Sequence, residues 1–164
     1  MLRIVGAALI SGAGIMLGLR TAADMRRRAA GCAALCRMLE LMAFELERFR
    51  TPMPELMDML AERTDRPASG LCRRCGTLLA SGATMAGAWE ESCAPLPERE
   101  RAALLPLAGV LGRYGGEEEL LALERTAREM DGLRGELIGR YREESRLALG
   151  LSAGMASLVA VLLL

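Results

Sequence analysis

The chain has 164 residues, of which 52% are hydrophobic and 26% charged, and its 21 basic and 21 acidic residues give a net charge of zero. It contains no histidine and no lysine, which excludes a lysine-containing phosphate-binding loop, a Ser-His or Cys-His nucleophilic pair and a histidine metal ligand. A neutral chain with only 3% aromatic residues also lacks the basic surplus and the stacking side chains typical of nucleic-acid binding. We therefore expect no nucleic-acid partner.

The first predicted element is an uncharged stretch near the N-terminus. No charged residue lies between Arg3 and Arg20, a gap of 16 residues, and an apolar run near this length can cross a membrane as a helix. The alternative is an exported helical protein whose first segment is a cleaved signal peptide. Arg3 would then be the basic start of that peptide, and residues 21–23 its small-residue cleavage site. Because the run is long for a signal peptide and a strongly basic stretch follows it, we predict a retained transmembrane helix over residues 1–20.

An amphipathic helix is expected next, over about residues 22–50, and it can continue from the first transmembrane helix. Its apolar residues recur at spacings of four and three, the pattern of one buried helix face: Leu35, Leu39, Met42, Leu46 and Phe49. The sequence "RTPMPE" then ends this helix and starts another. Thr51 is the expected N-cap and Pro52 the first helical residue. Proline suits this position because the N–H there has no partner within the helix. This second helix is expected to end near Arg63.

Two short helices are expected between residues 71 and 93. Apolar spacing within residues 71–79 predicts a third helix that ends at Gly82. Thr84 can cap a fourth helix that holds Trp89, the only tryptophan of the chain. The indole of Trp89 is interpreted either as a core anchor or as a contact for a partner.

A fifth helix is expected over residues 104–111, with Pro106 as a kink or an early boundary. Gly115 and Gly116 then form a turn, and three acids, Glu117–Glu119, follow where the macrodipole of a sixth helix favours negative charge. This helix is expected to run to about Arg146. The acid runs at 90–91 and 117–119 are interpreted as solvated faces, so we predict no catalytic acid–base pair.

The last predicted element, residues 147–164, has 18 residues and no charge. Its only polar side chains are Ser152 and Ser157, whose hydroxyls can bond to the preceding helical turn. A buried core helix is the alternative, but such a helix usually shows a polar stripe. We predict a second transmembrane helix.

Five cysteines are present: Cys32, Cys36, Cys72, Cys75 and Cys93. The "CRRC" sequence at Cys72 and Cys75 allows a redox pair whose thiol pKa is lowered by the arginines, or a zinc site completed by the other cysteine pair. However, no βαβ pattern surrounds it, and both pairs lie inside predicted helices. The third interpretation, which we favour, is packing of small apolar residues in a helical bundle. We predict no cofactor and no metal.

Arginines and glycines suggest how the two transmembrane helices are oriented and packed. Basic residues near a span favour its cytoplasmic side, and eight arginines flank the inner ends of the two spans: Arg20, Arg26, Arg27, Arg28, Arg134, Arg140, Arg142 and Arg146. We therefore predict a cytoplasmic middle segment, with both termini outside. Each span also carries a GxxxG pair, Gly14 with Gly18 and Gly150 with Gly154, which favours close helix packing within one chain or between chains.

Together these elements predict an all-α protein. Residues 21–146 are expected to form a cytoplasmic antiparallel bundle of about six helices. Transmembrane helices over residues 1–20 and 147–164 flank it.

The order of these features resembles the stage III sporulation protein AB family of endospore-forming bacteria. The resemblance covers essentially the whole chain, and its most specific pieces are "TPMPE" at 51–55, "AWE" at 88–90 and "LG" at 111–112. The family usually has an acidic residue shortly after the last pair and a glutamine further on. Gly115 and Glu119 stand near those two places here.

The resemblance implies a subunit of the secretion-like sporulation complex between mother cell and forespore. It implies a helical domain similar to the inner-membrane platform protein of type II secretion and type IV pilus machines. The protein would lie in the mother-cell membrane around the forespore, with its middle domain in the mother-cell cytoplasm near the stage III sporulation protein AA ATPase. Homo-oligomers are possible.

We therefore expect a non-enzymatic scaffold that couples this complex to its ATPase. The residues expected to contact partners are those of the matching motifs: Thr51, Pro52, Glu55, Trp89 and Glu90. A membrane-anchored thiol-redox or zinc-binding regulator that uses Cys72 and Cys75 is the alternative.

Overall fold

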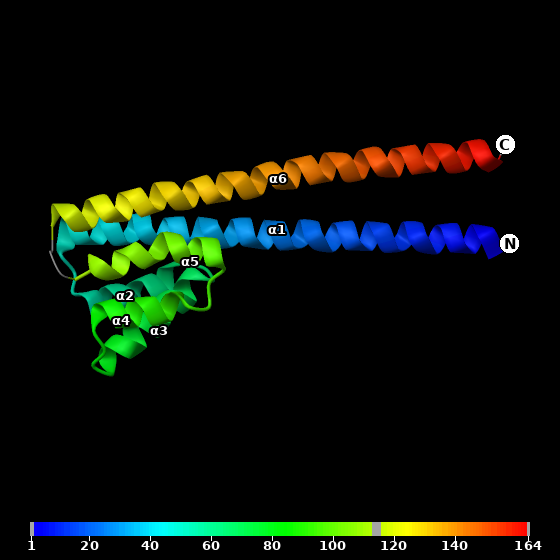
Figure 1. Ribbon diagram of the computed structural model, residues 1–164. Coiled ribbons are helices and arrows are strands. Elements are labelled where there is room, and N and C mark those ends of the chain that lie inside the picture. The colour runs from blue at the N-terminus through cyan, green and yellow to red at the C-terminus, as the bar shows by residue number, and fades with distance from the viewer. Residues whose placement is uncertain (1, 113–115, 164) are drawn as a thin grey trace. The chain divides into compact units, whose positions relative to one another are not determined.

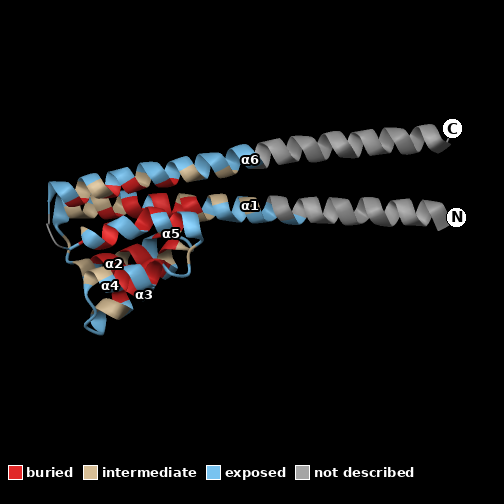
Figure 2. Cartoon of the chain, viewed as in Figure 1, coloured by how far each residue is buried: buried red, intermediate tan, exposed pale blue. Residues whose placement is uncertain are grey.

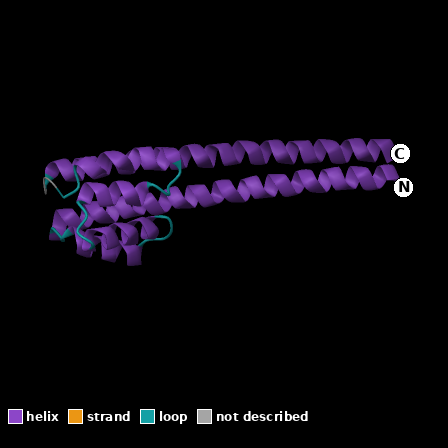
Figure 3. Cartoon of the chain, turned by 60° about the horizontal axis from the view of Figure 1, so that its bottom comes forward, coloured by secondary structure: helices purple, strands orange, loops and turns teal. Residues whose placement is uncertain are grey.

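The computed structural model describes the backbone of residues 2–112 and 116–163, and the side chains of residues 20, 23–112 and 116–140. Within these ranges it contains α-helices and one 3-10 helix but no strand (Figure 3). The chain divides into two compact units. One is a helical bundle formed by Ala30–Gly135, and the other is a terminal unit formed by Met1–Ala29 and Glu136–Leu164.

Two long helices each contribute to both units. α1 spans Leu2–Phe49 and α6 spans Glu117–Leu163. The amphipathic helix therefore continues from the first apolar stretch, as the sequence allowed, and the sixth helix runs past Arg146 into the last one. Inside the bundle the two helices lie side by side (Figures 1 and 3), and the Cys36 Sγ lies 3.9 Å from the Ala127 carbonyl oxygen.

The two predicted transmembrane spans, residues 1–20 and 147–164, lie outside the residues whose side chains the structure describes, apart from Arg20. The same holds for the glycine pairs Gly14 with Gly18 and Gly150 with Gly154. Among the described residues, no helix carries an apolar stretch long enough to cross a membrane.

Three short helices come after α1 in the chain, near the positions predicted for them. They are α2 (Met53–Arg63), α3 (Ala68–Ala80) and α4 (Met85–Cys93). The Thr84 hydroxyl caps α4 by accepting the Gly87 N–H at 3.3 Å. Gly82, which ends the turn after α3, has a φ of +91°, a conformation that glycine adopts without a Cβ clash.

The start of α2 differs from the prediction. Pro52, not Thr51, is its N-cap residue, and the Pro52 carbonyl accepts the Leu56 N–H at 3.0 Å. The helix therefore begins one residue later than expected, and Pro54 occupies its first turn. Arg50, two residues before this cap, adopts the left-handed region with a φ of +50°.

The fifth helix was predicted at the wrong place. α5 spans Glu98–Leu104, and Leu105–Gly109 form the 3-10 helix η1. Pro97 precedes the first turn, where its missing N–H is harmless, and acidic residues in that turn suit the macrodipole. Pro106 lacks the N–H that a continuing α-helix would need, so it marks an early boundary.

The core of the bundle lies between α1 and the short helices. α3 packs against α2 and α4, and α4 packs against η1. Buried faces of these helices turn toward one another (Figure 2), and their largest fully buried side chains include Leu35, Leu39, Met42, Leu56, Leu60 and Trp89. Burial of each such side chain contributes about 1.5–3 kcal/mol. The predicted apolar face of α1 fails at its end, since Phe49 is 64% exposed.

Candidate functional site

The thiols of α3 and α4 are fully buried, and the pKa of each is raised. Burial, and to a smaller extent the neighbouring Cys75 and Cys93 thiols, raise the pKa of Cys72 to about 12. Burial raises the pKa of Cys75 to about 11, although a hydrogen bond with Ser92 acts in the lowering direction, and it raises that of Cys93 to about 12. Because the thiolate is the reactive form, these raised pKa values lower the thiolate fraction of all three groups near neutral pH.

The two arginines of "CRRC" do not activate these thiols. Arg73 and Arg74 are exposed, and the Arg74 guanidinium donates to the Glu91 carboxylate at 3.0 Å on the surface. Nor does the described part of the chain contain three cysteine or carboxylate residues placed to hold a metal ion. This geometry therefore gives no support to a redox or zinc function of Cys72 and Cys75.

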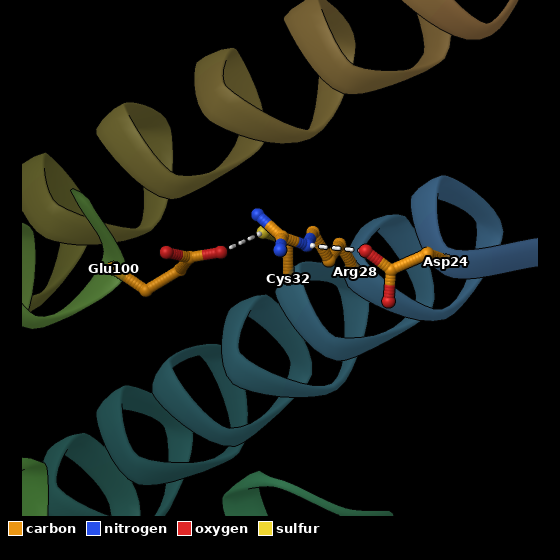
Figure 4. A network of polar contacts seen from close by, with 4 residues as sticks. All are labelled: Asp24, Arg28, Cys32 and Glu100. Atoms are coloured by element: carbon orange, nitrogen blue, oxygen red, sulfur yellow. Dashed lines mark hydrogen bonds and ion pairs between the residues drawn. The ribbon is translucent and has the colours of Figure 1, made fainter. Parts of the chain in front are cut away.

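A fourth thiol faces a buried carboxylate across the bundle. Cys32 of α1 donates to the Glu100 Oε1 at 3.5 Å, and Figure 4 shows the two side chains pointing toward each other. Burial and the Glu100 charge together raise the pKa of Cys32 to about 12. Glu100 itself is only 7% exposed. Sequence analysis missed it, because "ERER" has the composition of a solvated helix turn.

The second buried carboxylate binds the backbone of Gly112, where other chain segments meet. Glu119, 3% exposed, accepts the Gly112 N–H at 2.9 Å. Gly112 has a φ of +73°, and a Cβ on it would lie 3.5 Å from the Met85 Cγ and 3.9 Å from the Met53 Cγ. The start of α2, the start of α4 and the "LG" pair therefore meet at Gly112. The expectation that Glu119 is solvated was wrong; its place near the family's glutamine was the available signal.

The structure separates the five predicted contact residues by exposure. Thr51 is half-buried, whereas Pro52, Glu55 and Glu90 are exposed. Glu55 lies in the first turn of α2, where negative charge is favourable.

Trp89 differs from these residues. Its side chain is fully buried, and its Nε1–H donates to the Leu104 carbonyl at 2.9 Å. This is the core-anchor arrangement, which joins α4 to the end of α5 and leaves Glu90 as the exposed neighbour.

The terminal unit contains a shallow groove of about 230 Å³, lined by Met25, Arg26, Ala29, Leu137 and Ile138. Arg26 is the only charged residue among them.

Comparison with known proteins gives two matches. The model of a family described as stage III sporulation protein AB matches residues 3–164. A solved structure of a stage III sporulation protein AB has 17% sequence identity and a TM-score of 0.62, covering 68% of this chain and 94% of that chain. At this identity the structural match shows a shared fold alone. Comparison with curated proteins gives no match.

Proposed function

The chain belongs to the stage III sporulation protein AB family, and we propose that it is a non-enzymatic platform subunit of the sporulation channel complex between mother cell and forespore. The observation that carries the proposal is the family match, which runs from residue 3 to residue 164 and so includes both apolar ends. In this proposal residues 1–20 and 147–164 are transmembrane helices. The middle of the chain faces the mother-cell cytoplasm.

The bundle would act as a rigid adaptor that couples the complex to its stage III sporulation protein AA ATPase. Its buried, neutral thiols and its densely packed helices suit a scaffold. The contact surface would include Pro52 and Glu55 at the start of α2, and Glu90 on α4, all of which are exposed. Trp89 would support this surface from inside by its bond to Leu104.

A single surface cysteine tests the orientation. Ser81, exposed just after α3, can be replaced by cysteine, and the native bundle thiols are too buried to compete for a labelling reagent. In sporulating cells we expect Ser81→Cys to react with a membrane-impermeant maleimide only after permeabilisation, and the intact mass to retain residues 1–20. Labelling of intact cells from the outer side, or loss of the first span, would contradict the proposed topology.

Co-purification from sporulating cells tests the role. We expect the chain to retain other subunits of the complex and the ATPase, and Glu55→Arg or Glu90→Arg to reduce ATPase recovery. Glu118→Arg, an exposed acid at the start of α6, is the matched control. Failure of the unaltered protein to retain any subunit would remove the scaffold function, and equal recovery for all three variants would remove the assigned surface.

A further inference from the structure

The side of α1 that faces away from the bundle core carries an exposed phenylalanine among charged residues. Phe44 is 47% exposed, and the Arg48 guanidinium lies over its ring at 5.5 Å from the ring centre. Phe49, at the end of α1, packs edge-on against Phe44 with ring centres 6.3 Å apart. These two are the only phenylalanines of the chain, and neither is used in the core. Exposed aromatic side chains grouped in this way are typical of a contact surface.

The charges around Phe44 are sorted by sign. At about 100° per residue, Arg37 and Arg48 lie roughly 20° and 40° to one side of Phe44 along the helix surface. Glu40 and Glu47 lie roughly 40° and 60° to the other side. All four are exposed, and within the described part of the chain none of them makes an ion pair. The surface, called here the Phe44 face, is thus an apolar centre between a basic strip and an acidic strip.

We propose that the Phe44 face binds the same face of a second copy of this chain, with the two α1 helices parallel. A two-fold axis parallel to the helices sets the basic strip of one copy against the acidic strip of the other. A two-fold axis perpendicular to the helices instead sets like charges together. Charge complementarity therefore selects a second copy in the parallel orientation, with Phe44 meeting the partner's Phe44 at the centre.

Membrane anchoring agrees with the parallel orientation. This one supporting argument rests on the proposed function. Two copies held in one membrane by the same end of α1 present their Phe44 faces in parallel. A contact along a few turns of one helix falls below the roughly 1,200 Å² of a standard stable interface. Tethering in a membrane raises the effective concentration of such a contact, so the full chain in membranes is the form to test.

A cysteine placed on the Phe44 face can report, by disulfide cross-linking, whether two copies are in contact and whether their α1 helices are parallel. Ala33 lies roughly 20° from the line of Phe44 and about 16 Å before it along α1. In a parallel pair the two copies of Ala33→Cys face each other, whereas in an antiparallel pair they lie about 33 Å apart. We expect rapid disulfide-linked dimer from Ala33→Cys on mild oxidation of membranes, and none from Ser81→Cys. Phe44→Ala in the Ala33→Cys background should reduce the dimer several-fold, and the matched exposed change Leu121→Ala in α6 should not.

A charge swap tests the pairing itself. In the Ala33→Cys background, Arg48→Glu should lower the cross-linking rate about tenfold, because it places carboxylates of the two copies opposite each other on both sides of the symmetric contact. Adding Glu47→Arg reverses this charge pair, while Arg37 and Glu40 keep their places, and should restore the rate. Arg125→Glu, an exposed charge reversal on α6, is the control and should have no effect.

Several results would overturn the proposal. These are no dimer from Ala33→Cys, an equal dimer from Ser81→Cys, a cross-link to a different protein, or a rate that the charge swap does not change. The experiment stays readable if the proposed scaffold role fails, because cross-linking between two copies depends neither on which side of the membrane the bundle faces nor on recovery of other subunits.

Discussion

Raising the pH from 8 to 10 is expected to destabilise the bundle through the three thiols at the α3–α4 contact. The usual pKa of a thiol is 9.0, and in the folded bundle the pKa of Cys72 rises to about 12, that of Cys75 to about 11 and that of Cys93 to about 12. A raised folded pKa means that the unfolded chain releases its protons first as the pH rises. The stability that these thiols confer is therefore complete below about pH 9 and is lost progressively toward pH 11–12.

The size of the effect follows from proton linkage. One pH unit above the unfolded pKa changes the free energy of unfolding by about 1.4 kcal/mol for each thiol that stays protonated in the fold. The three thiols together would then remove about 4 kcal/mol at pH 10, a large part of the 5–15 kcal/mol typical of a folded domain. No lysine titrates in this window, because the chain has none.

The assay is guanidinium unfolding of the full chain in detergent, followed by circular dichroism at pH 8 and pH 10 with a reductant present. Cys93→Ala should lose about 1 kcal/mol less than the unaltered protein between the two pH values, whatever its stability at pH 8. Ser81→Ala, exposed and without an ionising group, is the control. An equal loss in the Cys93→Ala variant would refute the reasoning, since it would mean that this thiol ionises as easily in the bundle as in the unfolded chain.

Three further substitutions test polar and backbone features of the bundle, each by the free energy of unfolding at pH 7. Trp89→Phe should cost about 1–3 kcal/mol, because it leaves the Leu104 carbonyl without its donor; a neutral result would argue against that bond. Glu119→Ala should cost about 1–3 kcal/mol, whereas Glu119→Gln keeps an acceptor for the Gly112 N–H and should cost much less. Gly112→Ala should destabilise by about 1–2 kcal/mol because of its positive φ, and Gly109→Ala, which meets open space, should not; equal values would rule out this explanation.

Helix positions were predictable where local chemistry decides them. Gly82 and Thr84 determine where α3 ends and α4 begins, because a positive φ and a hydroxyl cap are properties of single residues. The prediction of the α2 N-cap failed, because that position does not depend on the type of one residue alone. Thr51 is a suitable cap by type, but Pro52 takes the N-cap position, two residues after the left-handed backbone of Arg50.

The buried carboxylates could not be identified from composition. Glu98 and Glu100 stand in the same short run, yet Glu98 is exposed and pairs with Arg101, whereas Glu100 meets the Cys32 thiol of a distant helix. Local sequence is nearly identical for the two, so only the tertiary arrangement separates them. The same holds for Glu118 and Glu119.

The position of Trp89 has a practical consequence for spectroscopy. The chain has one indole, and it lies fully buried in the bundle with its N–H bonded to Leu104. Its emission should therefore be blue-shifted in the folded state and move to longer wavelength when the α4–η1 contact opens. Fluorescence of the unaltered protein thus follows the integrity of the bundle alone, in detergent or in vesicles, without an added dye.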